Sequence, residues 1–243
     1  MARFFVDVPL HPGLTLDLPE PVVRHLQVLR LREGEALTLF NGLGGEFSAT
    51  LTQLGRREAL CELGAHDAVS RESPIWLGLA QAISSGERMD FTLQKGVEMG
   101  VSVFQPLAAR RSVVKLSGER ADKRLQRWQE IVVSACEQSG RTVIPQVLPI
   151  LSVEEWLARQ DEVPVRLLLS PLGSKRLVDI AQRPAAAWLM AGPEGGYTSE
   201  EEQAALDAGW TPLKLGGRVL RTETAALAAV AALQTVWGDY AFS

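Results

Sequence analysis

The feature that constrains the fold most is a regular alternation of apolar strand segments and helical segments that begins at Ile75. Short, continuously apolar runs bounded by turn residues are typical of strands that are buried on both faces. Strands of this kind that alternate with amphipathic helices build a parallel sheet covered by helices. We therefore predict a parallel α/β domain over residues 71–243.

The apolar runs and helical patterns define the elements of this domain. The predicted strands are Ile75–Ala80, Val103–Leu107, Val165–Leu169, Ala186–Met190 and Trp210–Leu215. The predicted helices are Glu87–Met99, Glu119–Ser139, Val153–Gln160, Leu177–Gln182, Ser199–Ala208 and Thr222–Trp237. Two helices begin with a capping box, in which Ser152 precedes Glu155 and Thr198 precedes Glu201 by three residues.

The first 70 residues have a different pattern, in which short strands are separated by prolines and glycine turns. The predicted strands are Arg3–Val8, Leu14–Leu18, Ala36–Phe40, Phe47–Leu54 and Ala59–Leu63, with helical spacing over Pro21–Leu29. Short strands at this spacing predict a small β-barrel. The polar segment 66–74 is the predicted linker, so the predicted domains are residues 1–70 and 71–243.

Composition excludes several classes of protein. The longest apolar run, Ala225–Leu233, is about half of the ~18 residues that a membrane-spanning helix needs, and residues 1–7 lack the pattern of a signal peptide. The two cysteines are too few for a disulfide framework, and the three histidines show no metal-ligand spacing. We therefore expect a soluble, cytoplasmic protein without a metal.

Charge is unevenly distributed in this chain of net charge −4. Lys and Arg exceed Asp and Glu only in residues 71–150, and this excess is due to one stretch that contains Glu119 and Asp122 as its only carboxylates. Its cations are Arg110, Arg111, Lys115, Arg120, Lys123, Arg124 and Arg127. Such a cluster can be a footprint for phosphates. It can equally be a solvated helix face with ion pairs four residues apart, and the sequence leaves both interpretations open.

Three glycine-bearing loops follow three predicted strands, at 170–173, 191–196 and 216–224. Ligands bind at the carboxyl ends of parallel strands, and glycine lets the backbone approach a ligand closely. The loops fit neither the dinucleotide fingerprint nor the phosphate-binding loop of known nucleotide sites. Any one of them can be a simple turn, but three together predict a ligand pocket.

Motifs along the whole chain resemble those of one family. They are Arg3–Phe5, His25–Arg30, Gln94–Val101, Arg111–Ser112, Arg127–Trp128, Glu137–Arg141, Gly192–Gly196 and Leu215–Ala225. In this order they resemble the RsmE family, bacterial small-subunit ribosomal RNA methyltransferases of the SPOUT superfamily. The last two motifs are the most specific. One departure is visible in 84–90, where many relatives carry a lysine near the start.

The resemblance implies a fold, a reaction and partners. The implied fold is a SPOUT-type parallel α/β domain with a deep trefoil knot, plus an N-terminal PUA-like β-barrel that binds RNA. General topology rules would not suggest a knot. The implied reaction uses S-adenosylmethionine to methylate N3 of one uridine in 16S ribosomal RNA, and the implied assembly is a homodimer. The alternatives are an RNA-binding ribosome-assembly factor without turnover and an α/β enzyme for another adenine nucleotide.

The loops and the resemblance together suggest site residues. Those expected to hold the cofactor are Leu169, Ser170, Pro171, Gly192, Pro193, Glu194, Gly195, Gly196, Leu215, Gly216, Val219, Leu220, Thr224 and Ala225. Gly195 is expected to present bare backbone to the cofactor. The residues expected to contact RNA are Arg3, Arg24, Arg30, Arg110, Arg111 and Lys115. His25 is more readily interpreted as a core histidine.

Two further residues are candidates for the chemistry. N3 of uridine must lose a proton before it attacks, so a base or a cation that stabilises the resulting anion would help. Arg221 can hold a phosphate or polarise a uracil carbonyl, and Glu223 can be the base. Alternatively, Thr222 caps the last helix and Glu223 complements the helix dipole. This helix is apolar nearly all round, which places it in or behind the expected dimer interface.

Overall fold

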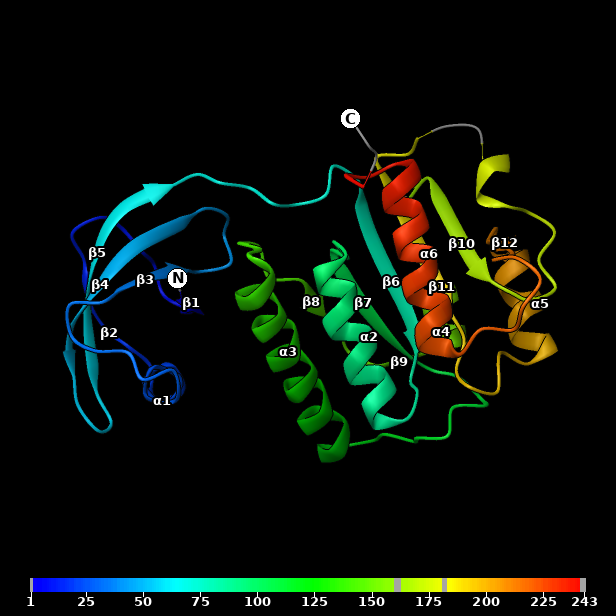
Figure 1. The fold of residues 1–243 in the computed structure, drawn as a ribbon. Helices are drawn as coiled ribbons and strands as arrows, with labels where there is room; N and C mark the ends of the chain where they lie inside the picture. Colours follow the sequence, from blue (N-terminus) through cyan, green and yellow to red (C-terminus); the bar gives the residue numbers. More distant parts are fainter. Residues whose placement is uncertain (1, 160–162, 181–182, 241–243) are drawn as a thin grey trace. The chain divides into compact units, whose positions relative to one another are not determined.

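The chain forms two compact units in the computed structural model, which describes residues 2–159, 163–180 and 183–240 (Figure 1). The first unit contains residues 1–72 and 136–144. The second contains residues 73–135 and 145–243. The first unit is thus built from two separate pieces of the chain, and we call residues 136–144 the returning segment.

The first unit is a five-stranded sheet with one helix. Its strands β1 (Ala2–Phe5), β2 (Thr15–Asp17), β3 (Ala36–Phe40), β4 (Glu46–Leu54) and β5 (Ala59–Asp67) have the order β1-β3-β4-β5-β2. The pair β1 and β3 is parallel, and the other pairs are antiparallel. The helix α1 (Glu20–Val28) buries Val22, Val23 and Leu26 against the strands. The strand β5 runs four residues beyond its predicted end, because His66 and Asp67 still pair with β4.

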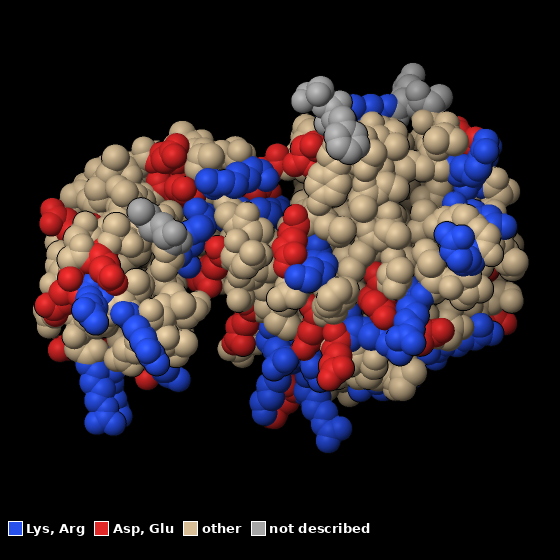
Figure 2. All heavy atoms as spheres, viewed as in Figure 1, with Lys and Arg blue, Asp and Glu red and all other residues tan. Residues whose placement is uncertain are grey.

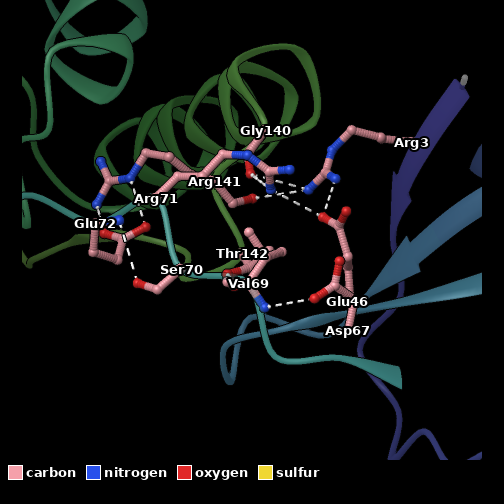
Figure 3. A network of polar contacts seen from close by, with 10 residues as sticks. All are labelled: Arg3, Glu46, Asp67, Val69, Ser70, Arg71, Glu72, Gly140, Arg141 and Thr142. Carbon is pink, nitrogen blue, oxygen red and sulfur yellow. Dashed lines mark hydrogen bonds and ion pairs between the residues drawn. The ribbon is translucent and has the colours of Figure 1, made fainter. Parts of the chain in front are cut away.

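Polar contacts join the returning segment to the sheet of the first unit (Figure 3). The guanidinium of Arg3 pairs with the carboxylate of Glu46 and donates to the carbonyl oxygen of Gly140 at 3.2 Å. Arg71 donates to the same two partners, at 3.1 Å to Glu46 and 2.9 Å to Gly140. Arg3 and Arg71, near the two ends of residues 1–72, therefore both donate to the carbonyl oxygen of Gly140 in the returning segment.

Two more contacts complete this attachment. The buried guanidinium of Arg141 pairs with the carboxylate of Glu72. The backbone N–H of Phe5 in β1 donates to Oε1 of Glu137 at 2.9 Å. Burial raises the pKa of Glu137, and the Phe5 N–H only partly offsets this effect. Sequence patterns did not indicate the returning segment, because its contacts join residues more than 60 positions apart.

The second unit contains a parallel sheet, as predicted. Its strands have the order β12-β10-β11-β6-β7-β8, and β9 also pairs with β7. Every pair is parallel. The strands are β6 (Trp76–Ala82), β7 (Val103–Ala108), β8 (Gln146–Val147), β9 (Leu151–Ser152), β10 (Val165–Leu169), β11 (Ala186–Ala191) and β12 (Thr211–Leu213). The two-residue strands β8 and β9 were not predicted, because so short a segment shows no periodicity.

The helices of the second unit follow the prediction except at two places. They are α2 (Gly86–Glu98), α3 (Glu119–Ser139), α4 (Val153–Leu157), α5 (Ser199–Asp207) and α6 (Thr222–Val236); the last residues of α3 belong to the first unit. Both predicted capping boxes are present. The helix predicted to reach residue 160 ends at Leu157, and residue 160 lies outside the described residues. The helix predicted over 177–182 is only a 3₁₀ turn, η1 (Leu177–Asp179), which buries no side chain; residues 181 and 182 lie outside the described residues.

Helices cover the sheet on both faces. The helix α2 packs against α6, which lies on β11, while α4 packs against α5 (Figure 1). On the face covered by α4, the rings of Trp156 and Trp188 meet edge to face with centroids 4.7 Å apart. A Cβ atom on Gly78 of β6 would lie 2.3 Å from the ring of Trp188. Glycine is therefore required at this position for the tryptophan to lie across the sheet.

A polar side chain fixes α6 in the core of the second unit. Gln234 is completely buried, and its Nε2 donates to the carbonyl oxygen of Met99 at 2.8 Å. Its Oε1 accepts from Oγ of Ser73 at 2.7 Å. Because both ends of the amide are bonded to other segments, the helix cannot slide without losing hydrogen bonds. Within the described residues, no helix has the length and apolar character to cross a membrane.

Candidate active site

Three loops meet at the carboxyl edge of the sheet, as predicted. They follow β10, β11 and β12, which are adjacent because β10 lies between the other two. Together with the start of α6 they enclose a cavity of about 490 Å³. A cavity of this size is within the range of ~300–1,000 Å³ typical of small-molecule sites.

The cavity is lined by nearly all the residues that were expected to hold the cofactor. Arg221 also lines it, whereas Thr224 and Glu223 do not. Thr224 instead points outward on the exposed side of α6. The lining residues that sequence reasoning did not name are Arg88, Ala191, Tyr197, Glu202, Leu213, Lys214, Arg218 and Thr222. Arg88 follows β6 at the same sheet edge, so the rule that selected the other loops would have selected it as well.

A chain of hydrogen bonds ties the start of α6 to the loop after β11, residues 192–196, which we call the glycine loop. The hydroxyl of Thr222 donates to the carbonyl oxygen of Gly192 at 2.6 Å. The same hydroxyl accepts from Nε2 of Gln81, a fully buried residue of β6, at 3.0 Å. Thr222 is therefore not the cap of α6. Arg221 occupies the cap position, without a side-chain hydrogen bond to the helix.

The glycine loop rests on Arg111. One guanidinium nitrogen of Arg111 donates to the carbonyl oxygens of Gly195 and Tyr197, each at 3.2 Å. A Cβ atom on Gly195 would lie 3.2 Å from Cβ of Arg111. Gly195 lines the cavity, but a side chain added there would first meet Arg111.

Glu194 is the charged member of the glycine loop. Its Oε1 accepts from the backbone N–H of Ser85 at 2.9 Å and from the guanidinium of Arg88 at 3.0 Å. Burial opposes ionisation of Glu194, but these donors outweigh it and the pKa lies below its ordinary value. The loop therefore carries a carboxylate that is held in its charged form against the start of α2.

Arg221 and Glu223 differ in their surroundings. Arg221 is exposed and lines the cavity, and no side chain in the described ranges forms a hydrogen bond or ion pair with it. The side chain of Glu223 is only 15% exposed, and its Oε2 lies 3.9 Å from Nε of Arg88. Arg88 thus stands between two carboxylates, Glu194 and Glu223.

The three cations expected to bind RNA in the second unit are already engaged. Arg110 pairs with Glu154 at 3.0 Å and with Glu200 at 2.9 Å. Lys115 donates to the carbonyl oxygens of Ala109 and Arg110 at 3.3 and 3.1 Å. Arg111 supports the glycine loop as described above. These contacts explain much of the local positive charge as internal pairing.

The RNA candidates of the first unit differ in their availability. Arg3 is largely buried and paired with Glu46, which does not favour it as an RNA ligand. Arg24 forms an exposed pair with Glu20. Arg30 is exposed at the end of α1. His25 is not in the core, contrary to the interpretation above; it lies exposed on α1 with its ring edge-on to Phe4, at a centroid distance of 5.3 Å.

Neither cysteine is suited to chemistry at this site. Cys61 and Cys136 are both free and buried. Burial raises the pKa of the Cys61 thiol to about 11 and that of the Cys136 thiol to about 12. Across the described ranges, no group of three or more His, Cys, Asp or Glu side chains is arranged to hold a metal ion.

Comparisons with known proteins assign the family of each unit. Residues 71–234 match a family described as an RNA methyltransferase domain, and residues 18–64 match one described as an RNA methyltransferase PUA domain. The chain is similar to a ribosomal RNA small subunit methyltransferase E from Neisseria gonorrhoeae, solved bound to S-adenosyl methionine. The identity is 50%, the similarity covers 99% of each chain and the TM-score is 0.93.

Two further relatives show the same pattern. A Legionella pneumophila structure in complex with bound SAM is 38% identical over 98% of each chain, with a TM-score of 0.95. A ribosomal RNA small subunit methyltransferase E from Mycobacterium bovis is 36% identical over 218 residues, which are 86% of this chain and 83% of the relative. The similarity thus extends over both units rather than the cavity alone.

Proposed function

This chain belongs to the RsmE family of ribosomal RNA small subunit methyltransferases, and on that premise we propose that it methylates 16S ribosomal RNA with S-adenosylmethionine. The observation that carries the proposal is the cavity between the three loops. The relative from Neisseria gonorrhoeae, with half of its residues identical, was solved with S-adenosyl methionine. The PUA match in the first unit supports RNA as the acceptor.

The residues that line the cavity fit this cofactor. Glycine-loop backbone and apolar side chains such as Leu169 and Leu215 can cover a flat adenine ring, and the loop polar groups can bind its edges. When bound, S-adenosylmethionine supplies a methyl group on a positively charged sulfur. The glycine loop and the start of α6 are held by Gln81, Arg111 and Thr222, so they are positioned before any ligand arrives.

The methylated atom that we propose is N3 of a uridine. This nitrogen carries a proton that must leave before it can attack, and the negative charge then spreads onto the neighbouring carbonyl oxygens. Arg221 lines the cavity and has no side-chain partner among the described residues, so its guanidinium can stabilise that charge. Glu223 is the proposed base, although it is held by Arg88 outside the cavity lining. Because Arg221 lines the cavity and Glu223 does not, we propose Arg221 as the residue that contacts the uracil ring.

A test of the reaction separates the enzyme from an RNA-binding assembly factor. Calorimetry should show binding of S-adenosylmethionine to the purified protein. Incubation with the cofactor and small subunits from cells that lack the gene should produce 3-methyluridine, detected by mass spectrometry of nucleosides. Binding of RNA without binding of the cofactor would instead support the assembly factor.

The role of Arg221 is tested with the Arg221→Ala variant. We expect methylation under single-turnover conditions to slow by roughly 100-fold, the usual effect of removing one donor to a developing oxyanion. RNA affinity should change much less. If the rate falls only in proportion to RNA binding, Arg221 is an RNA anchor and not a catalytic residue.

We further propose that the protein acts as a homodimer in the cytoplasm, where small subunits assemble. The helix α6 buries one face in the second unit, but Thr224, Ala228 and Thr235 remain exposed on another. Small side chains of this kind allow a second helix to approach closely. The deep trefoil knot implied by the resemblance is likewise a proposal for this chain.

A further inference from the structure

Four cations on α3 form a continuous stripe. Arg120, Arg124 and Arg127 lie on one helix face because they are spaced by four and three residues, and Lys123 lies beside them. We call these four residues the basic stripe. Resting on the proposed function, we propose that the phosphate backbone of the substrate RNA crosses the methyltransferase domain along this stripe.

The charges of the basic stripe are largely uncompensated. Across the described ranges, neither Arg120 nor Arg124 has a carboxylate within 4.0 Å. Lys123 reaches Glu119 only at 3.8 Å, with its side chain 79% exposed. Arg127 pairs with Asp90 at 3.0 Å but remains 61% exposed. Solvent screening makes such exposed pairs weak, so these cations remain available to an external anion.

The stripe gains little from its own helix, apart from the exposed pair of Lys123 with Glu119. Arg120 is in the first turn of α3, and Lys123 and Arg124 are in the second. The N-terminal end of a helix carries partial positive charge, so cations there are unfavourable by a few tenths of a kcal/mol. Carboxylates in the first turn would stabilise the helix, whereas cations there do not. Helix stability therefore does not account for Arg120, and a bound anion would.

The stripe leads to the cavity across α2. The guanidinium of Arg124 lies 3.9 Å from the position that a Cβ atom of Gly86 would occupy, and Arg127 pairs with Asp90. Arg88, from the same helical turn of α2, lines the cavity and pairs with Glu194. Figure 2 shows Lys and Arg side chains gathered over the first turns of α3. A strand bound there can place one base at the cavity.

The length of the stripe fits a short run of phosphates. Seven residues of helix span about 10 Å. This length corresponds to roughly three nucleotides of one strand, at the ~3.4 Å axial rise of a nucleic-acid duplex. Arginine suits this role because its planar guanidinium can hold a phosphate with two hydrogen bonds. Each contact of this kind releases counterions from the RNA and so makes binding sensitive to salt.

The experiment uses the triple variant Arg120→Gln, Lys123→Gln, Arg124→Gln and in vitro transcribed 16S RNA as the probe. The slope of log affinity against log salt should become less steep by roughly two, since each lost phosphate contact removes about 0.7–0.9. The affinity for S-adenosylmethionine should be unchanged. The melting temperature should change little, because only Arg120 lies in the first turn of α3 and the exposed pair of Lys123 with Glu119 is weak.

A matched control removes the same net charge elsewhere on the second unit. Arg159, Lys175 and Arg183 are exposed and form no ion pair within 4.0 Å among the described residues, so a triple glutamine variant there changes the total charge equally. We expect this control to keep the salt slope of the original protein. An unchanged slope in the stripe variant, or an equal loss in the control, overturns the proposal. Failure of the unaltered protein to methylate RNA would instead overturn the proposed function.

Discussion

Arg30 is held in a backbone conformation that favours glycine. It is the one non-glycine residue with positive φ among those described, at 58°. It follows the last turn of α1, where its N–H bonds to the carbonyl of Gln27 and the N–H of Leu31 bonds to that of Leu26. This arrangement usually has glycine at the position of Arg30. An exposed arginine kept at such a position is consistent with a role for its side chain.

We therefore expect the Arg30→Gly variant to separate stability from binding. The first unit should be more stable by up to about 1 kcal/mol, since the left-handed conformation costs other residues roughly 1–2 kcal/mol and the flexibility of glycine cancels part of the gain. RNA affinity should fall at the same time. Thermal unfolding followed by amide circular dichroism and RNA titration measure the two effects. A variant that loses stability without losing affinity would contradict this account.

Arg111 makes a different prediction from the one suggested by its place in a basic stretch. Its guanidinium donates to the carbonyl oxygen of Gly195 in the glycine loop and to that of Tyr197, the residue after this loop. The Arg111→Ala variant should therefore weaken S-adenosylmethionine binding by roughly tenfold or more, because it removes the charged donor that two carbonyl oxygens share. The salt slope of RNA binding should stay unchanged. If the salt slope of RNA binding becomes less steep while cofactor affinity stays unchanged, Arg111 contacts RNA instead.

Sequence reasoning identified the loops of the site but not the direction in which each residue points. Glycines at 192, 195 and 196 indicated that the backbone approaches a ligand closely. Only the fold shows that a side chain at position 195 would point toward Arg111. The same limit applies to Arg110 and Lys115, since a charge count does not reveal which cations are paired internally. Pairing depends on residues such as Glu154 and Glu200, which lie far away along the chain.

At the scale of elements, α6 depends on one buried amide. Replacing Gln234 by leucine keeps a similar volume but leaves the carbonyl of Met99 and the hydroxyl of Ser73 without their partner. We expect the Gln234→Leu variant to lose roughly 2–4 kcal/mol of the free energy of unfolding of the second unit, at about 1–2 kcal/mol for each group.

Tryptophan fluorescence is the appropriate measurement for this variant. All six tryptophans lie within residues 73–135 and 145–243, so their emission reports the second unit alone. Gln203→Leu, on the exposed side of α5, is the control and should change stability by less than about 0.5 kcal/mol. Equal effects of the two substitutions would show that the buried bonds of Gln234 do not stabilise α6.

Most elements could be predicted because their residues are patterned locally. Apolar runs indicated the long strands, and the capping boxes of Ser152 and Thr198 indicated two helix starts. The elements that were not predicted are short or depend on residues that are distant in the sequence. The strand β8 consists of two residues, and the extension of β5 to Asp67 exists only because Glu46 lies opposite.

At the scale of the molecule, the dimer proposal leads to a direct measurement. One exposed side of α6 carries small residues, among them Ala228. Light scattering at micromolar concentration should therefore give about twice the mass of one chain, 26.5 kDa. Ala228→Arg should favour the monomer without altering the fold. A monomer in the unaltered protein would defeat the proposal.

The returning segment sets the order of events during synthesis. The sheet of the first unit leaves the translating ribosome early, but Gly140, Glu137 and Arg141 are made about 70 residues after Glu72. At ~5–20 residues per second the delay is roughly 4–14 s. Throughout that interval Arg3 and Arg71 lack the carbonyl that they share. The first part to be made is therefore not the first to be finished, and a nascent chain cut at residue 72 lacks the piece that completes it.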